Sequence, residues 1–253
     1  MTKVEIMRQR FVTWMIAAAI AGAAVMQDAG RAAAEDPVSG LTTGQIEQIV
    51  RDYLLREPEV IYEALQVFQE RQKSAEAARQ KEIVAEKSDE IFNDDRDAEV
   101  NPDGDVTLVE FFDYRCGYCR RMTEGLRSLV GDDTGIRLVF KEFPILGEDS
   151  MRASKAALAA KRQGAYDGFH AALMTASDMS MEAIERLADH YELDFDKLAE
   201  DMESEEVAAQ ISDTLRLGHT LGISGTPSFI IGETVIPGAI PVDQLAELVE
   251  QHR

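Results

Sequence analysis

The chain of 253 residues contains only two cysteines, and their position limits the possible folds more than any other feature. Cys116 and Cys119 directly follow Val106–Phe112, a β-branched and aromatic run of strand length, and they open a helix expected over 117–130. A second strand-like run, Arg137–Phe143, comes next. A strand, a helix and a strand in this order form a β-α-β unit, so the two strands are expected to lie parallel.

The remainder of the C-terminal part is predicted to be mostly helical. Residues 148–222 have helical periodicity almost throughout, and turn signals divide them into several helices. Two short strands, Ser228–Ile231 and Thr234–Ile236, flank Gly232 and Glu233 and predict a tight hairpin. Val242–Glu250 has the pattern of a last amphipathic helix. The predicted fold class is therefore α/β.

The placement of the two cysteines gives them different chemistry. The first backbone N–H groups of a helix lack intrahelical partners and the helix dipole is positive there, so both stabilise a thiolate at Cys116. A lowered thiol pKa makes Cys116 a nucleophile towards disulfides. Cys119 lies one turn further on and can reach back to resolve a mixed disulfide. Positive potential from Arg115, Arg120 and Arg121 adds modestly to this effect.

Composition restricts the alternatives for this pair. A zinc site would need ligands from four scattered histidines, because there is no second cysteine pair. A purely structural disulfide would close a two-residue gap, where loop-closure stabilisation is smallest. We therefore predict a redox pair with no metal and no cofactor other than the redox-active Cys116–Cys119 disulfide. A formal net charge of −21 argues against a nucleic-acid partner, which requires a basic surface.

Two further features agree with a redox pair. Pro227 stands immediately before a strand, and a cis Thr226–Pro227 bond would leave the Thr226 backbone free to pair with an extended substrate. From composition alone, an ordinary trans proline is the more frequent case. Glu110 lies on the first strand, six residues before Cys116, and an inward side chain there could accept a proton from the second thiol. The alternative is a surface glutamate on an alternating strand.

The N-terminal residues have the features of a secretory signal peptide. A basic start is followed by the uncharged run Phe11–Met26 and by Ala32-Ala33-Ala34, a small-residue cleavage site. We assign residues 1–34 to this signal, with an uncleaved N-terminal anchor as the alternative. Secretion would place the cysteines in an oxidising compartment, where a disulfide persists.

Residues 35–98 are predicted to form a helical oligomerisation and linker region. A helix capped by Thr42 or Thr43 and a second helix after Pro58 each carry an apolar face, and residues 69–82 are polar all round. This apolar surface must pack on its own domain or on another copy. The polar stretch favours another copy, so we expect a homo-oligomer assembled through residues 41–70. An acidic, turn-rich segment at 93–105 predicts a domain boundary near 98.

Residues 99–253 resemble the DsbA-like branch of the thioredoxin fold. The matching residues are Val109 to Tyr114, then Cys116 to Cys119, then Thr226 and Pro227. The resemblance implies a thioredoxin fold with a helical domain inserted at about 148–222. It implies that Cys116 is the nucleophile, Cys119 the resolving thiol, Glu110 the buried acid and Pro227 a cis proline facing the pair. Substrate would contact Thr226, Gly117 and Tyr118.

The residues between the cysteines indicate a direction of redox chemistry. Strong oxidases of this branch carry Pro-His there, whereas Gly117-Tyr118, with Thr226 before the proline, resembles the isomerase pattern. Residues 41–92 resemble the oligomerisation stalk of the suppressor-of-copper-sensitivity C proteins. We therefore expect a periplasmic isomerase or reductase, free or membrane-attached, acting on unfolded or misdisulfided secreted proteins and supplied with electrons by a membrane redox partner. The alternatives are a dithiol oxidase and a copper-tolerance module holding Cu(I) on the two thiolates.

Overall fold

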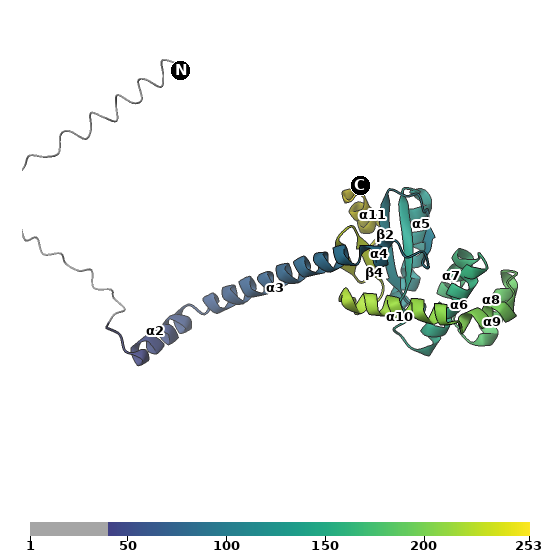
Figure 1. Ribbon diagram of the computed structural model, residues 1–253. Helices are drawn as coiled ribbons and strands as arrows, with labels where there is room; N and C mark the ends of the chain where they lie inside the picture. Colours follow the sequence, from purple (N-terminus) through teal and green to yellow (C-terminus); the bar gives the residue numbers. More distant parts are fainter. Residues whose placement is uncertain (1–39) are drawn as a thin grey trace, which may run out of the picture. The chain divides into compact units, whose positions relative to one another are not determined.

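The computed structural model describes residues 40–253, which divide into two compact units after Ala64 (Figure 1). The predicted signal peptide at 1–34 lies outside the described residues. Among residues 40–253, no helix combines the length and the apolar character that a membrane crossing requires.

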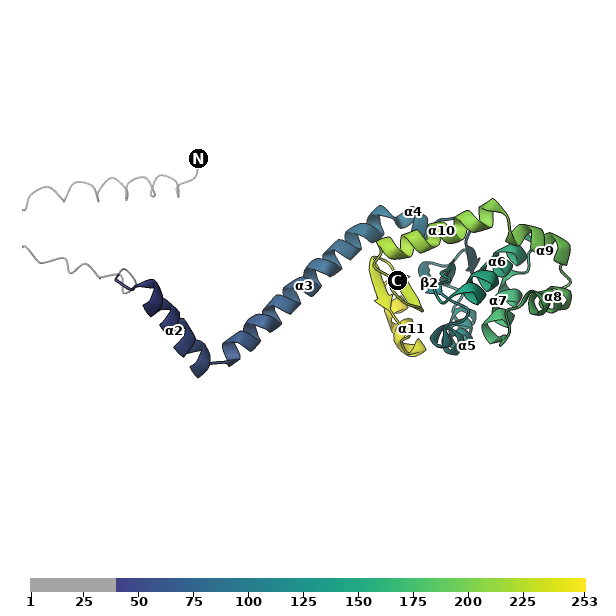
Figure 2. The ribbon, with the colours of Figure 1, turned by 90° about the horizontal axis from the view of Figure 1, so that it is seen from below.

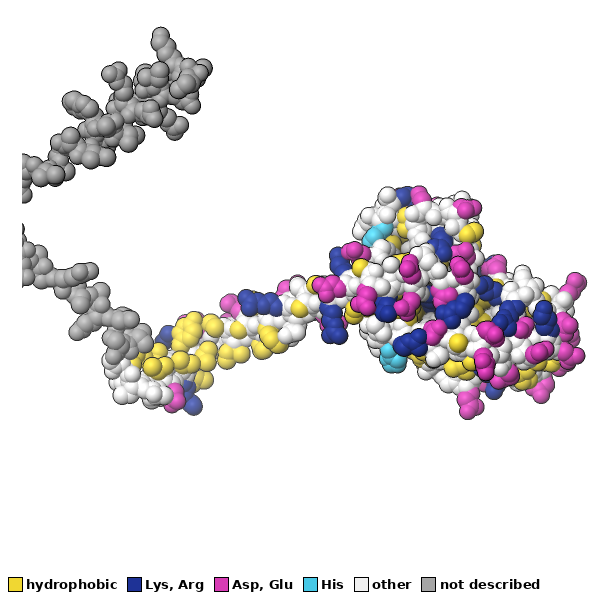
Figure 3. All heavy atoms as spheres, in the orientation of Figure 1, with side chains coloured by type: hydrophobic (Ala, Val, Ile, Leu, Met, Phe, Trp, Pro, Cys, Tyr) yellow, Lys and Arg dark blue, Asp and Glu magenta, His cyan; other side chains and the backbone are white. Residues whose placement is uncertain are grey.

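The first unit contains helix α2, Thr43–Arg56, and the start of helix α3, Glu59–Glu86. The predicted cap is confirmed: the backbone N–H of Gln45 bonds the Thr42 hydroxyl at 3.4 Å, and the Gln45 side chain accepts from the Thr42 N–H at 2.9 Å. This reciprocal arrangement satisfies two backbone donors at the helix start. Large apolar side chains stay exposed along α2 and, separately, along the first turns of α3 (Figure 3).

The second unit is built on a five-stranded sheet with the strand order β1-β3-β2-β4-β5. The two strands predicted to be parallel are β2 and β3, and their register pairs Val106 with Ile136 and Phe112 with Glu142. All other neighbouring strands are antiparallel. The predicted hairpin joins β4 to β5 through Gly232, whose φ of +55° lies in the region that favours glycine. The strands are β1, Ala98–Val100; β2, Val106–Phe112; β3, Ile136–Glu142; β4, Ser228–Ile231; and β5, Thr234–Pro237.

The helices of the second unit follow the predicted pattern with one difference. Helix α5 connects β2 to β3, five helices lie between β3 and β4, and α11 ends the chain (Figures 1 and 2). The predicted helical block is confirmed, but its last part breaks at Glu203 and Ser204, where the Ser204 hydroxyl caps α10. These helices are α4, Ser88–Phe92; α5, Gly117–Asp132; α6, Glu148–Arg162; α7, Tyr166–Thr175; α8, Met181–His190; α9, Phe195–Met202; α10, Glu205–Thr220; and α11, Val242–Gln251.

Each face of the sheet covers its own hydrophobic cluster. Leu108 and Phe112 of β2 belong to a cluster with α5, α6, α7 and α11. Val109 and Phe111 alternate with them and face a second cluster. The second cluster includes Val84 and Ile91 from α3 and α4, together with Leu217, Leu221 and Ile223.

The domain boundary differs from the one predicted near residue 98. The second unit begins at Leu65, and residues from Val84 onwards contribute to its core. Asp97 is buried and forms an ion pair with Lys141, and β1 pairs with β3 within the segment interpreted as a linker. The acidic composition of this segment is typical of an exposed linker. Its part in the fold could not be predicted, because the charge of Asp97 is compensated by a buried partner rather than by solvent.

Candidate active site

The two cysteines stand where the polypeptide leaves β2 and enters α5. Cys116 is the N-cap of α5, and Gly117, exposed to solvent, is its first helical residue. Cys119 lies one turn further and is fully buried, whereas Cys116 is 7% exposed. Both thiols are free. The sequence predicted this placement because the strand run ends directly before the pair.

The Cys116 sulfur is in contact with the loop that precedes β4. Its thiol donates a hydrogen bond to the carbonyl oxygen of Thr226 at 3.1 Å. The Thr226–Pro227 peptide bond is cis, as the resemblance implied. The fold thus brings Cys116 together with Thr226, although 110 residues separate them in the chain. Pro227 itself is buried, directly before β4.

Electrostatics distinguishes the two thiols. Burial opposes ionisation of Cys116, but hydrogen bonding by the side chains of Thr226 and Cys119 and by the backbone N–H groups of Cys119 and Tyr118 outweighs it and lowers the pKa of the Cys116 thiol. Burial raises the pKa of Cys119 well above its ordinary value, and the negative charge of Glu110 raises it further. Cys116 is therefore the thiol that ionises first, and Cys119 keeps its proton until a base removes it.

Glu110 points inward from β2. Its side chain is 3% exposed, which excludes the surface position considered from the sequence. Burial raises the pKa of Glu110 to about 8, and the charge of Glu142 contributes in the same direction. A carboxyl group that titrates near neutral pH can both accept and return a proton.

Tyr118 presents an exposed side chain between the cysteines. Its ring is 60% exposed, and the guanidinium of Arg121 lies 4.4 Å from the ring centroid. Arg120 points elsewhere: its Nε donates to the Tyr114 carbonyl at 2.7 Å and its guanidinium also bonds the carbonyl of Ala176. Arg120, one of the three arginines expected to add positive potential, is therefore engaged in hydrogen bonds to two backbone carbonyls.

Asp113 is a site residue for which the sequence analysis predicted no role. Its buried carboxylate accepts hydrogen bonds from the backbone N–H groups of Arg115, Ile145 and Leu146, at 2.7, 2.8 and 3.0 Å, and from the Ser150 hydroxyl at 2.7 Å. It thus ties the segment before Cys116 to the start of the inserted helices. In the sequence, the only indication of this role is the position of Asp113 directly after the strand and before the cysteine pair.

An apolar hollow borders the Thr226 loop. It has a volume of about 620 Å³ and is lined mainly by Phe143, Ile145, Leu146, Ile223 and Ser224. Ile145 and Leu146 are 39% and 52% exposed, so an apolar segment of another chain could cover them.

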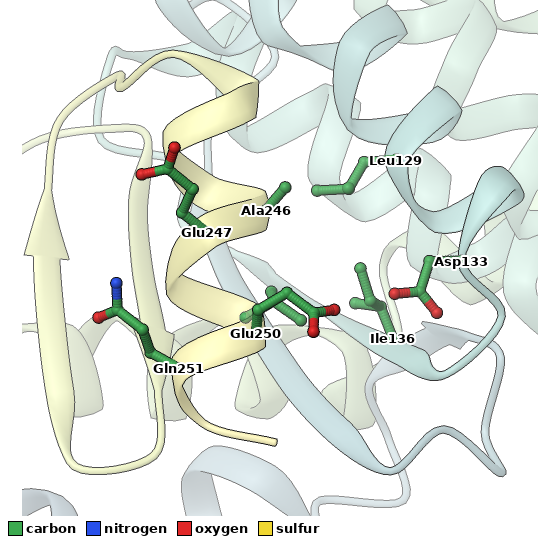
Figure 4. Close-up of a pocket in the computed structure, with 8 residues that line it drawn as sticks. Leu129, Asp133, Ile136, Ala246, Glu247, Glu250 and Gln251 are labelled. Carbon is green, nitrogen blue, oxygen red and sulfur yellow. The ribbon is translucent and has the colours of Figure 1, made fainter.

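A second hollow lies at the opposite end of β3, between α5 and α11 (Figure 4). Figure 4 shows the carboxylates of Asp133 and Glu250 on its rim. Arg253 pairs with both, at 3.0 and 2.5 Å, so their charges are compensated within the fold. Neither cysteine lines this hollow, and we assign it no chemistry.

Comparison with known proteins gives the same picture of the C-terminal part. A family model described as the DSBA-like thioredoxin domain matches residues 107–250, and one described as the Copper resistance protein ScsC N-terminal domain matches residues 43–75. Three curated relatives are Na(+)/H(+) antiporters. One of them, from Salinispora tropica, is 29% identical over 162 residues, and this chain spans only a quarter of its length.

Solved structures extend the similarity. A thioredoxin-like oxidoreductase from Silicibacter pomeroyi is 45% identical with a TM-score of 0.62, covering 64% of this chain and 95% of that one. The thiol-disulfide exchange protein alpha-DsbA2 from Wolbachia pipientis is 28% identical with a TM-score of 0.66, covering 71% and 98%. A linker-deletion mutant of Proteus mirabilis ScsC is 27% identical with a TM-score of 0.64, covering 85% and 98%. Since the first family model matches more than half of its residues, the chain belongs to the family of DSBA-like thioredoxin domains.

Proposed function

We propose that the chain is a thiol–disulfide oxidoreductase that acts on protein disulfides through Cys116 and Cys119. The observation that carries this proposal is the asymmetry of the pair. One thiol has a lowered pKa at a helix start beside Thr226, and the other is buried one turn behind it with a raised pKa. The similar Wolbachia protein, described as a thiol-disulfide exchange protein, supports the same chemistry.

The reaction runs in two exchanges. The Cys116 thiolate attacks one sulfur of a substrate disulfide, that disulfide breaks, and the released sulfur takes up a proton. Cys119 then gives its proton to Glu110 and attacks the Cys116 sulfur, which forms the Cys116–Cys119 disulfide and frees the second substrate thiol. Two electrons pass from the cysteine pair to the substrate, and a dithiol reductant must return them. When another substrate thiol attacks the mixed disulfide instead, the pair returns unchanged and the substrate is isomerised.

We favour isomerase or reductase activity over oxidase activity, because no histidine stands between the cysteines to stabilise the Cys116 thiolate further. The substrates would be unfolded or misdisulfided secreted proteins in the periplasm. The exposed Tyr118 ring, the Thr226 backbone and the apolar hollow beside it provide contacts for such chains. A membrane redox partner would keep the pair reduced.

Self-association through residues 41–70 belongs to the same proposal. Ile49, Val50 and Leu55 of α2 are at least half exposed, and so are Leu65 and Phe68 of α3. Apolar side chains in this number favour burial against another copy. Residues 43–75 match the N-terminal domain of ScsC, and this is the segment that resembles an oligomerisation stalk in sequence.

The decisive test is the fate of substrate in two single variants. Cys119→Ser should accumulate a mixed disulfide with a scrambled ribonuclease, visible by mass spectrometry, and Cys116→Ser should form none. The unmodified chain should restore activity to the scrambled ribonuclease when Cys116 starts reduced. Rapid oxidation of reduced ribonuclease without any recovery of scrambled enzyme would instead indicate an oxidase, and absence of both would refute exchange activity.

A copper-binding role is the second candidate, because residues 43–75 match a domain described by copper resistance. Two thiolates can hold Cu(I) as soft ligands. Titration with Cu(I) should then show one tight site in the reduced chain that disappears in Cys119→Ser. Equal binding by both would remove this candidate.

A further inference from the structure

Glu142, the last residue of β3, is a buried carboxyl group that the exchange reaction above does not use. Its side chain is 2% exposed. Oε1 accepts hydrogen bonds from the hydroxyls of Tyr114, at 3.0 Å, and Tyr166, at 2.8 Å. Oε2 is buried and has no partner among the described residues. A buried carboxyl oxygen without a hydrogen bond lowers the stability of the fold. Such a group therefore calls for a functional explanation.

The sheet register places Glu142 on the same face as Glu110. In the parallel pairing of β2 with β3, Glu110 lies opposite Phe140 and Phe112 lies opposite Glu142. Since side chains alternate between faces with a period of two, both carboxyl groups point to the cluster that contains Cys119. Two residues along neighbouring strands correspond to a Cα separation of about 8 Å.

The surroundings of Glu142 supply no compensating positive charge. Lys141 points to the opposite face, where it pairs with Asp97. His170 of α7 contacts the Tyr114 hydroxyl at 3.0 Å, and burial lowers the pKa of His170 to about 3, which keeps its ring neutral at physiological pH.

The remaining charged and titratable groups around the cluster have other partners or the wrong sign. Arg127 of α5 pairs with Asp167 at 2.8 Å, and Arg120 bonds backbone carbonyls. The hydroxyls of Ser154, Tyr166 and Tyr114 favour ionisation of Glu142, and the charge of Asp113, from the loop after β2, opposes it. Burial is the largest influence and raises the pKa of Glu142 to about 8. Glu110 and Glu142 are thus two like-charged acids in one apolar region, and each makes ionisation of the other harder.

We propose that Glu142, anchored by the hydroxyls of Tyr114 and Tyr166, is a positioning residue that sets how strongly Glu110 holds the proton it takes from Cys119. This inference rests on the proposed function, in which Cys119 resolves the mixed disulfide. When Glu142 is ionised, its charge makes Glu110 a stronger base towards the Cys119 thiol. When Glu142 is protonated, Glu110 releases its proton more readily. The protonation state of Glu142 therefore determines whether Glu110 more readily takes the proton from Cys119, as disulfide formation requires, or gives it back, as disulfide reduction requires.

The direct test is a carbon-13 NMR titration of the reduced full chain labelled in its glutamate carboxyl groups. The Glu110 signal is identified by its loss in Glu110→Gln. In Glu142→Gln we expect the Glu110 midpoint to fall by roughly one pH unit, the size of a like-charge interaction at such a distance. The reverse shift, of Glu142 in Glu110→Gln, should be equal because coupling is reciprocal. Glu99→Gln, the same change on β1 where Glu99 pairs with Arg137, is the matched control and should move neither midpoint.

Tyr166→Phe provides a second test if Glu142→Gln fails to fold. It keeps the carboxyl group and removes one donor, so Glu142 should ionise at higher pH and the Glu110 midpoint should fall. An unchanged Glu110 midpoint in whichever variant folds would overturn the inference.

A kinetic measurement separates this inference from the proposed function. Reduced chain mixed with 5,5′-dithiobis(2-nitrobenzoate) should release one coloured thiolate when Cys116 is modified and a second when Cys119 resolves the mixed disulfide. The pH profile of the second phase should move to lower pH in Glu142→Gln by the same amount as the Glu110 midpoint. If the unmodified chain shows no second phase, the proposed function fails. If it does and Glu142→Gln has the same profile, only the role of Glu142 fails.

Discussion

At the scale of single residues, the proposed activity depends on two sulfurs in different environments. Cys116 occupies the N-cap position, where the N–H groups of the first helical turn favour its thiolate, and Cys119 is enclosed by the core. The same side chain thus becomes more acidic at one position and less acidic three residues later. Local backbone geometry sets the first effect, and packing sets the second.

This difference predicts a selective alkylation pattern. Iodoacetamide should modify Cys116 of the reduced chain with a half-maximal rate below pH 9.0, the ordinary thiol value, because its pKa is lowered. Cys119 should stay unmodified over the same range, because it is buried and its pKa is raised. Peptide mass spectrometry after timed quenching measures both. Equal labelling of the two thiols would contradict the assignment.

The buried acids also predict how stability depends on pH. The pKa of Glu142 is raised from 4.5 to about 8, so the folded state binds more protons and stability falls as pH rises towards 8. His170 acts in the opposite direction only between about pH 3 and 6.5. Between pH 6.5 and 8 we expect Glu142 to cost about 1–2 kcal/mol of unfolding free energy. Urea denaturation should show that the decline becomes shallower by this amount in Glu142→Gln, while the part due to Glu110, whose pKa burial also raises to about 8, remains. A decline as steep as that of the unmodified chain would contradict the prediction.

At the scale of elements, Asp113 joins the segment before Cys116 to the loop that leads into α6. Replacing it by Asn turns one acceptor oxygen into a donor facing the N–H groups of Ile145 and Leu146. We expect Asp113→Asn to lower the unfolding free energy by roughly 2–4 kcal/mol. Asp149→Asn is the matched control: this half-exposed carboxylate pairs within its helix, with Arg152 at 2.9 Å, and should change stability by less than about 0.5 kcal/mol. Equal losses in a urea titration would show that the Asp113 contacts are unimportant.

The elements also show what the sequence could reveal. The parallel pair β2 and β3, the hairpin of β4 and β5 and the position of the cysteines were predictable, because each depends on a local pattern of side chains. Strand β1 was not: three residues, Ala98–Val100, pair with β3 inside an acidic stretch that has the composition of a loop. Its place depends on distant partners, among them the buried Lys141.

The candidate site was predictable to the same extent. Cys116, Cys119 and the cis Thr226–Pro227 bond follow from short motifs and a resemblance. Glu142 was hidden in a strand run, where its parity with Phe140 was the only sign that it points inward. Its tyrosine donors lie 28 and 24 residues away, a contact that only tertiary structure defines.

At the scale of the whole molecule, the proposed assembly surface and the candidate active site occupy different parts of the chain. The exposed large apolar side chains of α2 and α3 end at Phe68. Further along α3, the side chain of Gln80 donates to the Leu221 carbonyl at 3.0 Å. A truncation at residue 98 would therefore remove Val84, Ile91 and Ala98 from the core. A cut before Gln80 leaves them in place.

We accordingly expect deletion of residues 40–75 to give a monomer that retains exchange activity, as measured by light scattering and ribonuclease refolding. In the full-length chain, Phe68→Glu should weaken assembly because it places a charge in the apolar surface. Gln66→Glu, a charge added two residues earlier at a polar position, should not. An oligomer that persists after the deletion would locate assembly in the catalytic part.

The complete burial of Cys119 has a consequence for oxidative damage. Peroxide that reaches the more accessible Cys116 converts its thiolate to a sulfenic acid, which further oxidant would turn irreversibly into a sulfinic acid. Cys119 is shielded from the same attack yet adjacent, so it can condense with the sulfenic acid and expel water. The product is the same Cys116–Cys119 disulfide that forms during exchange. A dithiol reductant that reduces this disulfide therefore also reverses the oxidation of Cys116.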